Sequence, residues 1–176
     1  AAGGGDVKLQ TGEWSFTGPF GYFDKAALQR GFQVYREVCA GCHGLDYIAF
    51  RNLADLGYNE AEIKAIAADY EVMDGPDDEG EMFMRPARPA DIIPNPYRND
   101  NEARASNNGA MPPDLSLIAK ARANGPDYLY SLLLGYVDAP ADKDVPDGMH
   151  YNNAYSGNLI AMPQPIYGDD VEYADG

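Results

Sequence analysis

The sequence is organised around one pentapeptide, Cys39-Ala40-Gly41-Cys42-His43, which contains both cysteines of the 176-residue chain. This C-x-x-C-H pattern is typical of covalent haem attachment. Two thiols reach the two vinyl groups of a porphyrin, and the adjacent histidine turns its imidazole onto the iron. The pattern therefore predicts one haem c, bound through thioethers at Cys39 and Cys42, with His43 as an axial iron ligand.

Three other interpretations of the two cysteines are weaker. A thioredoxin-like dithiol needs a βαβ setting, whereas the residues before Cys39 have a helical pattern. A zinc site would have to use every cysteine and histidine of the chain, namely Cys39, Cys42, His43 and His150, without the usual spacing of a histidine pair. A structural disulfide across so short a loop is rarer still. Haem attachment is the interpretation that the sequence favours.

The residues before the motif predict a first helix of about residues 24–39. Asp24 is a good N-cap, and an apolar stripe follows at spacings of three and four residues, made of Leu28, Phe32, Tyr35 and Val38 or Cys39. Such a helix delivers the cysteines at its C-terminal end. Gly41 and Gly44 then let the backbone turn closely around a porphyrin.

Three further amphipathic helices are predicted, with starts at Asn59, Asp114 and Pro126. Between them, residues 74–113 and 137–176 are rich in Pro, Gly, Asn and Asp and have no long alternating pattern, which predicts long irregular loops. A short hairpin in either loop stays open. The predicted fold is mainly α, as a single c-type haem domain over residues 1–176.

The charge balance narrows the classes of partner. Acidic residues number 28 against 13 basic ones, which gives a net charge of -15. Such a negative field repels phosphate backbones and anionic lipid heads, so we expect no nucleic-acid partner and favour a basic protein. The longest apolar run, residues 128–137, is too short to span a bilayer, which predicts a soluble polypeptide.

The sixth iron position decides between electron transfer and ligand chemistry. The candidates are His150 and six methionines, of which Met111 and Met162 each precede a proline. Proline makes the chain stiff and non-helical there, which suits a thioether held over iron. The distance in sequence from His43 favours Met111, as in small soluble cytochromes c. The residues alone leave both methionines open.

Three runs carry a resemblance to a known family. They are residues 30–43, which end in the motif, Asn-Asn-Gly-Ala-Met-Pro-Pro-Asp-Leu-Ser at 107–116, and Asn-Leu-Ile-Ala-Met-Pro-Gln-Pro-Ile at 158–166. Together they resemble the cytochrome c1 family, the haem subunit of the cytochrome bc1 complex. The likeness runs in order from Phe16 to Gly176 and implies a cytochrome c-like haem domain with Met162 as the sixth ligand.

The resemblance also implies roles around the haem for Asn107, Pro112, Pro113, Arg122 and Tyr128. In such proteins an arginine at the place of Arg122 pairs with a haem propionate, and a guanidinium suits this because it offers a planar fork to a carboxylate. Tyr128 and Asn107 would be hydrogen-bonding neighbours, and the two prolines would line the pocket.

With His43 and Met162 both on the iron, no position is open for oxygen or peroxide. The expected chemistry is then one-electron cycling of Fe(III) and Fe(II), in which no side chain acts as acid, base or nucleophile. The thioether ligand and an apolar pocket favour the ferrous state.

The resemblance implies the Rieske iron-sulfur protein as electron donor, cytochrome b as neighbour and a soluble or membrane-attached cytochrome c as acceptor, docked on the acidic surface. Haem is attached on the exported side of a membrane, so we expect the periplasmic side of a bacterial inner membrane or the mitochondrial intermembrane space. Family members continue into a further helix and a C-terminal transmembrane anchor. Because the given chain ends at Gly176, we expect a soluble fragment that lacks both.

Two alternatives stay open. One is a free soluble cytochrome c carrier, for which Met111 could be the ligand. The other is a c-type haem enzyme or gas sensor with a labile sixth ligand. Binding of carbon monoxide to the reduced protein separates the second alternative from the electron carriers.

Overall fold

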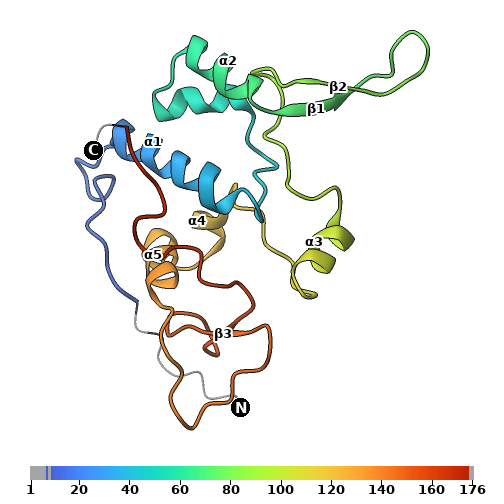
Figure 1. Ribbon diagram of the computed structural model, residues 1–176. Coiled ribbons are helices and arrows are strands. Elements are labelled where there is room, and N and C mark those ends of the chain that lie inside the picture. Colours follow the sequence, from blue (N-terminus) through green and yellow to red (C-terminus); the bar gives the residue numbers. More distant parts are fainter. Residues whose placement is uncertain (1–6, 8, 175–176) are drawn as a thin grey trace. The chain divides into compact units, whose positions relative to one another are not determined.

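The computed structural model describes residue 7 and residues 9–174. The chain divides into two compact units. Unit 1 consists of residues 1–21, 97–112 and 117–176, and unit 2 consists of residues 22–96 and 113–116. Helices and long irregular segments dominate both units, with two short hairpins (Figure 1). The C-x-x-C-H motif belongs to unit 2.

Unit 2 begins with the helix that carries the motif. Helix α1 (Lys25–Val34) starts where the sequence predicts, because the Asp24 carboxylate accepts hydrogen bonds from the N–H groups of Ala26 and Ala27. The helix then widens into the π-helix η1 (Tyr35–Cys39). The predicted helix of residues 24–39 is therefore present, as an α-helix followed by one π turn.

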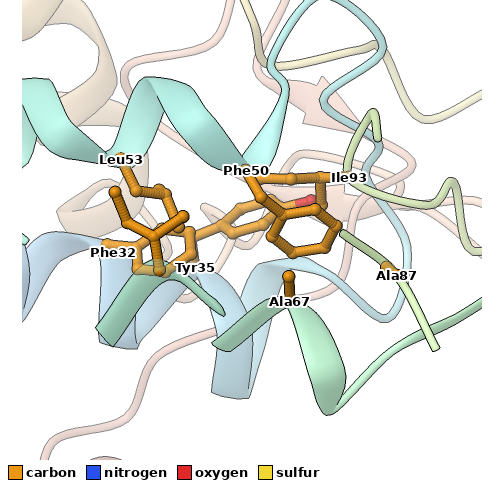
Figure 2. Packing of buried hydrophobic residues seen from close by; sticks show 8 residues of the cluster. Phe32, Tyr35, Phe50, Leu53, Ala67, Ala87 and Ile93 are labelled. Atoms are coloured by element: carbon orange, nitrogen blue, oxygen red, sulfur yellow. The ribbon is translucent and has the colours of Figure 1, made fainter. Parts of the chain in front are cut away.

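Two more helices pack against α1 and η1. The 3-10 helix η2 (Phe50–Leu56) and helix α2 (Glu60–Ala68) enclose the core, and α2 begins with a capping box between Asn59 and Glu62. Figure 2 shows the side chains that meet between these elements. The buried core consists of Phe32, Tyr35, Phe50, Leu53, Ile63, Ala67, Ala87 and Ile93. Burial of these apolar side chains drives the packing of unit 2.

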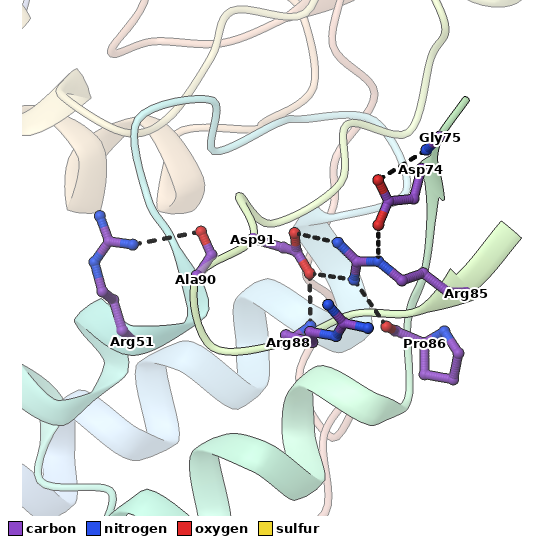
Figure 3. Close-up of polar contacts among 8 residues, drawn as sticks. All are labelled: Arg51, Asp74, Gly75, Arg85, Pro86, Arg88, Ala90 and Asp91. Carbon is purple, nitrogen blue, oxygen red and sulfur yellow. Dashed lines mark hydrogen bonds and ion pairs between the residues drawn. The ribbon is translucent and has the colours of Figure 1, made fainter. Parts of the chain in front are cut away.

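A hairpin follows α2. Strands β1 (Glu71–Asp74) and β2 (Phe83–Pro86) pair antiparallel, with Met73 opposite Met84. Arg85 anchors the hairpin because its guanidinium forms ion pairs with both Asp74 and Asp91 (Figure 3). The backbone N–H of Phe50 donates to the Asp91 carbonyl, which ties this network to the start of η2.

Unit 1 contains the remaining elements, which are α3 (Asp100–Ser106), α4 (Ile118–Ala121), α5 (Gly125–Leu134), β3 (His150–Tyr151) and β4 (Leu159–Ile160). Strands β3 and β4 form a second antiparallel hairpin. The N-terminal segment lies along α5. The N–H of Gly12 and the indole of Trp14 both donate to the Asp127 carboxylate, and Gln10 exchanges hydrogen bonds with Ser131.

Two of the sequence expectations need correction. Residues 74–113 are less irregular than expected, because they hold helix α3. The short hairpins that the sequence left open are present, as β1–β2 and β3–β4. The helix predicted from Asp114 is wrong over its first turn, since α4 begins only at Ile118. The reason is local: the Asp114 carboxylate accepts from the N–H groups of Asp46 and Ser116, which holds this segment against the chain after the motif.

Candidate haem-attachment site

The two cysteines lie where the helix ends. Cys39 is the last residue of η1 and is half-buried, whereas Cys42 is exposed, and no disulfide joins the two. Burial raises the pKa of the Cys39 thiol, and the neighbouring Cys42 adds to this effect. The N–H groups of Cys42 and His43 donate to the Cys39 carbonyl at 3.1 and 2.9 Å, so the motif folds into a tight turn. This turn presents both thiols next to the histidine.

The imidazole of His43 is oriented by a carbonyl. Its Nδ1 lies 2.7 Å from the backbone oxygen of Pro113. Because a carbonyl can only accept, Nδ1 carries the proton and donates it. The lone pair is then on Nε2, which is the arrangement that a metal-ligating histidine needs.

Residues 113–116 form a strip that lies against the motif and the residues after it. The N–H of Leu115 donates to the Gly44 carbonyl at 3.0 Å, and the N–H of Tyr47 donates to the Ser116 hydroxyl at 3.2 Å. Asp114 accepts from the Asp46 N–H at 2.7 Å. Burial opposes ionisation of Asp114, but hydrogen bonds from Asp46 and Ser116 outweigh it and lower the pKa of the carboxyl. The strip holds the carbonyl of Pro113 at the His43 ring.

The two candidate methionines belong to unit 1. Met162 is half-buried, and its backbone carbonyl accepts from the Tyr136 hydroxyl at 2.9 Å. This bond holds the main chain of Met162 and does not involve its thioether. Met111 is 40% exposed. His43 belongs to the other unit, so ligation by Met162 stays a prediction.

Asn107 ends helix α3. Its side-chain amide donates to the Tyr97 hydroxyl at 2.9 Å and to the Ala103 carbonyl at 2.7 Å. Both amide protons are therefore used inside unit 1, and only the amide oxygen of Asn107 is left for a neighbouring group.

Arg122 directly follows α4 and is exposed. Its Nη1 donates to the Ala121 carbonyl at 3.3 Å, and no ion pair involves Arg122 in the part of the chain that the structure describes. Tyr128 is half-buried. Burial and Tyr155 raise the pKa of Tyr128, while the charge of Arg122 lowers it. The guanidinium of Arg122 thus remains available to an external carboxylate.

Pro112 is half-buried in unit 1, and Pro113 is exposed in unit 2. The carbonyl of Pro113 accepts a hydrogen bond from Nδ1 of His43. Sequence reasoning missed this role, and it missed the role of Asp114. For Asp114 the available signal was the residue type itself, since an aspartate side chain often accepts from the backbone N–H two residues on, as Asp114 does from Ser116.

The donor set fits haem c better than zinc. Among residue 7 and residues 9–174, no three His, Cys, Asp or Glu side chains come together as a metal-ligating group. His150 lies in β3 of unit 1, opposite Ile160. Two thiols on one turn, with one adjacent histidine whose Nδ1 is already engaged, match two thioether anchors and one axial ligand.

A helix that ends at the first cysteine of a C-x-x-C-H motif, whose histidine has its Nε2 lone pair available, defines the class of c-type cytochromes. The sequence model of the Cytochrome C1 family matches residues 14–176. The chain belongs to the cytochrome c1 family.

Curated relatives agree with this assignment. The chain is similar to "Cytochrome b/c1" of Bradyrhizobium diazoefficiens, with 48% identity over 98% of the chain and 28% of that protein. It is similar to "Cytochrome c1 1, heme protein, mitochondrial" of Arabidopsis thaliana, with 50% identity over 93% of the chain and 53% of the relative. It is also similar to "Cytochrome b-c1 complex catalytic subunit, mitochondrial" of Candida albicans, with 53% identity over 93% of the chain and 57% of the relative.

The chain spans about a quarter to a little over half of these three relatives' lengths. Within the described residues, no helix combines the length and the apolar character that a membrane span requires.

Proposed function

We propose that this chain transfers single electrons through a covalently bound haem c, as the cytochrome c1 part of a bc1 complex. The observation that carries the proposal is the hydrogen bond that His43, directly after the two cysteines, donates to Pro113, with Nδ1 2.7 Å from the carbonyl oxygen. That bond directs Nε2 toward a metal. The family match over residues 14–176 supports the same cofactor.

In this proposal each residue has a distinct task. Cys39 and Cys42 form the thioether bonds, and His43 donates its Nε2 lone pair to the iron. Met162 supplies the sixth ligand. A bound haem c supplies the one-electron Fe(III)/Fe(II) couple, and the chain's own task is to hold these ligands rigid and keep water away.

The charged group proposed for the haem edge is Arg122. Its guanidinium pairs with a propionate, because a planar fork suits a carboxylate. Tyr128 and the oxygen of Asn107 act as hydrogen-bonding neighbours, and Pro112 and Pro113 line the pocket.

The proposed partners follow from the family and from the charge. The electron donor is a Rieske iron-sulfur protein, and cytochrome b is the neighbour within the complex. The acceptor is a soluble or membrane-attached cytochrome c, which a net charge of -15 attracts when its docking face is basic. The proposed location is the periplasmic side of a bacterial inner membrane or the intermembrane space of mitochondria. The full-length protein is proposed to continue into a further helix and a membrane anchor.

The sixth ligand can be tested by optical spectroscopy. Ferric haem with a sulfur ligand has a weak charge-transfer band at the red end of the spectrum, and a six-coordinate ferrous haem with tight ligands excludes carbon monoxide. We expect the haem-loaded chain to show the band and to exclude carbon monoxide. We expect Met162→Leu to lose the band and to bind carbon monoxide when reduced.

The matched control is Met111→Leu, which removes the other proline-preceding thioether. It should leave the band and the exclusion of carbon monoxide unchanged. If Met111→Leu loses the band while Met162→Leu keeps it, Met162 is not the ligand and the free-carrier interpretation gains. If the parent chain binds carbon monoxide, the electron-transfer proposal gives way to a haem enzyme or gas sensor.

A further inference from the structure

Tyr35 contacts both ends of the C-x-x-C-H turn. The helix changes from α to π at this residue, so that its carbonyl accepts from the N–H of Ala40 at 2.8 Å instead of from a residue four positions on. Its phenol hydroxyl donates to the backbone carbonyl of His43 at 3.1 Å. The main chain of Tyr35 thereby holds Ala40, which follows the first cysteine, and its side chain holds His43, which follows the second.

The ring of Tyr35 is itself held rigidly. The residue is 9% exposed, and the ring stacks on Phe32 with centroids 6.2 Å apart and planes 19° apart. Figure 2 shows it within the core cluster, near Leu53 and Phe50. Burial also raises the pKa of the Tyr35 phenol, so the hydroxyl stays protonated and able to donate.

His43 is consequently fixed at three points. Its amide donates to the Cys39 carbonyl at 2.9 Å, its Nδ1 donates to Pro113 at 2.7 Å, and its carbonyl accepts from Tyr35. The Pro113 bond restrains the ring, and the Cys39 bond restrains the amide side of the His43 backbone. The Tyr35 bond restrains the carbonyl side of that backbone, and together the three bonds set the direction of the Nε2 lone pair.

We propose that Tyr35 is a positioning residue that sets the orientation of the His43 imidazole on a haem iron, through its hydrogen bond to the His43 carbonyl. The inference deepens the proposed function and rests on it. In this proposal Tyr35 is not an iron ligand. It acts through the backbone of the axial ligand.

The test is Tyr35→Phe in the haem-loaded chain. The substitution keeps the ring and its packing and removes only the donor to His43. Proton resonances of the haem methyl groups in the ferric protein report the direction of the axial imidazole plane, which a loss of stability alone does not move. We expect these resonances to shift in Tyr35→Phe, while the content of covalently bound haem stays the same.

The matched control is Tyr58→Phe. Tyr58 packs edge-on against Phe32 at 6.0 Å, in the same aromatic group, but the phenol bond to the motif belongs to Tyr35. Tyr58→Phe should leave the methyl resonances in place. Replacement of Tyr35 by p-aminophenylalanine restores a donor at the same position and should return the resonances toward those of the parent chain.

The outcomes separate this inference from the proposed function. Resonances that are identical in the parent chain and in Tyr35→Phe overturn the positioning role while haem attachment stands. Equal shifts in Tyr35→Phe and Tyr58→Phe also overturn it, because they show a general effect of the core. A parent chain that binds no covalent haem overturns the proposed function itself.

Discussion

At the scale of single residues, a network of ion pairs joins the β1–β2 hairpin to Asp91. The fork of Arg85 donates to both oxygens of Asp91, at 2.7 and 3.0 Å, and Arg88 donates its backbone N–H to the same carboxylate (Figure 3). Arg85 first, and then the Arg88 N–H, lower the pKa of Asp91 from 3.8 to about 2. The network should therefore make stability depend on pH.

The sign follows from proton binding. Because the folded-state pKa of Asp91 is depressed, the unfolded chain binds more protons between pH 3.8 and about 2. The contribution of Asp91 is fully present above this window and is lost as the pH falls through it. We expect urea unfolding midpoints of the parent chain and Asp91→Asn to differ at pH 6 and to converge toward pH 2. Asp138→Asn, which removes an equal charge from an exposed position, should show no such convergence.

At the scale of elements, helix α2 depends on its N-terminal capping box. The Asn59 side chain accepts from the Glu62 N–H at 3.0 Å, and the Glu62 carboxylate accepts from the Asn59 N–H at 2.7 Å. We expect Asn59→Ala to lower the free energy of unfolding by about 1 kcal/mol, the usual cost of a lost N-cap. Asn59→Asp should retain most of the stability. Asn101→Ala makes the same chemical change inside α3, where alanine is the better helix former, and should not destabilise. Chemical denaturation measures both variants, and an equal loss of unfolding free energy in Asn59→Ala and Asn101→Ala would refute the capping argument.

The caps also show what the sequence could predict. Asp24 and Asn59 each precede an apolar stripe of helical spacing, so both helix starts were predictable from local pattern alone. Helix α3 was missed although Asn99 and Glu102 have the spacing of a cap, because too few apolar residues follow them. The helix start predicted at Asp114 was wrong because an aspartate carboxylate can cap either a helix or a turn. The contact with Asp46, which is distant in sequence, selects the turn.

The candidate site also has a part that local pattern predicts and a part that depends on contacts between distant segments. The two cysteines and the histidine that are proposed to hold a haem lie within five residues of one another, so one pentapeptide is enough to predict them. The carbonyl that orients His43 comes from Pro113, and the donor that fixes its backbone comes from Tyr35. Such contacts join segments through the folded chain, and no local pattern encodes them. This is why the motif predicts the cofactor but not the residues that orient its ligand.

At the scale of the whole molecule, the dominant property is the charge of -15, which arises from 28 acidic and 13 basic residues. A field of this size accelerates encounters with a basic partner, and salt screens it because the Debye length falls to about 8 Å at 0.15 M. Several exposed acidic residues gather at the tip of the β1–β2 hairpin, namely Asp77, Asp78, Glu79 and Glu81. These residues contribute to the summed negative charge, and we expect the charge of the whole chain to govern the rate of encounter with the acceptor.

We therefore expect the second-order rate constant for electron transfer from the haem-loaded, reduced chain to a lysine-rich cytochrome c to fall about tenfold or more from 0.01 to 0.2 M salt. Ferricyanide, a small anionic oxidant, provides the opposite control, because its rate constant should rise as repulsion is screened. Stopped-flow absorbance measures both reactions. If both rate constants fall with salt, ions bind to the protein itself and the steering argument fails. If neither changes, the charge of the chain does not steer the encounter and the argument fails.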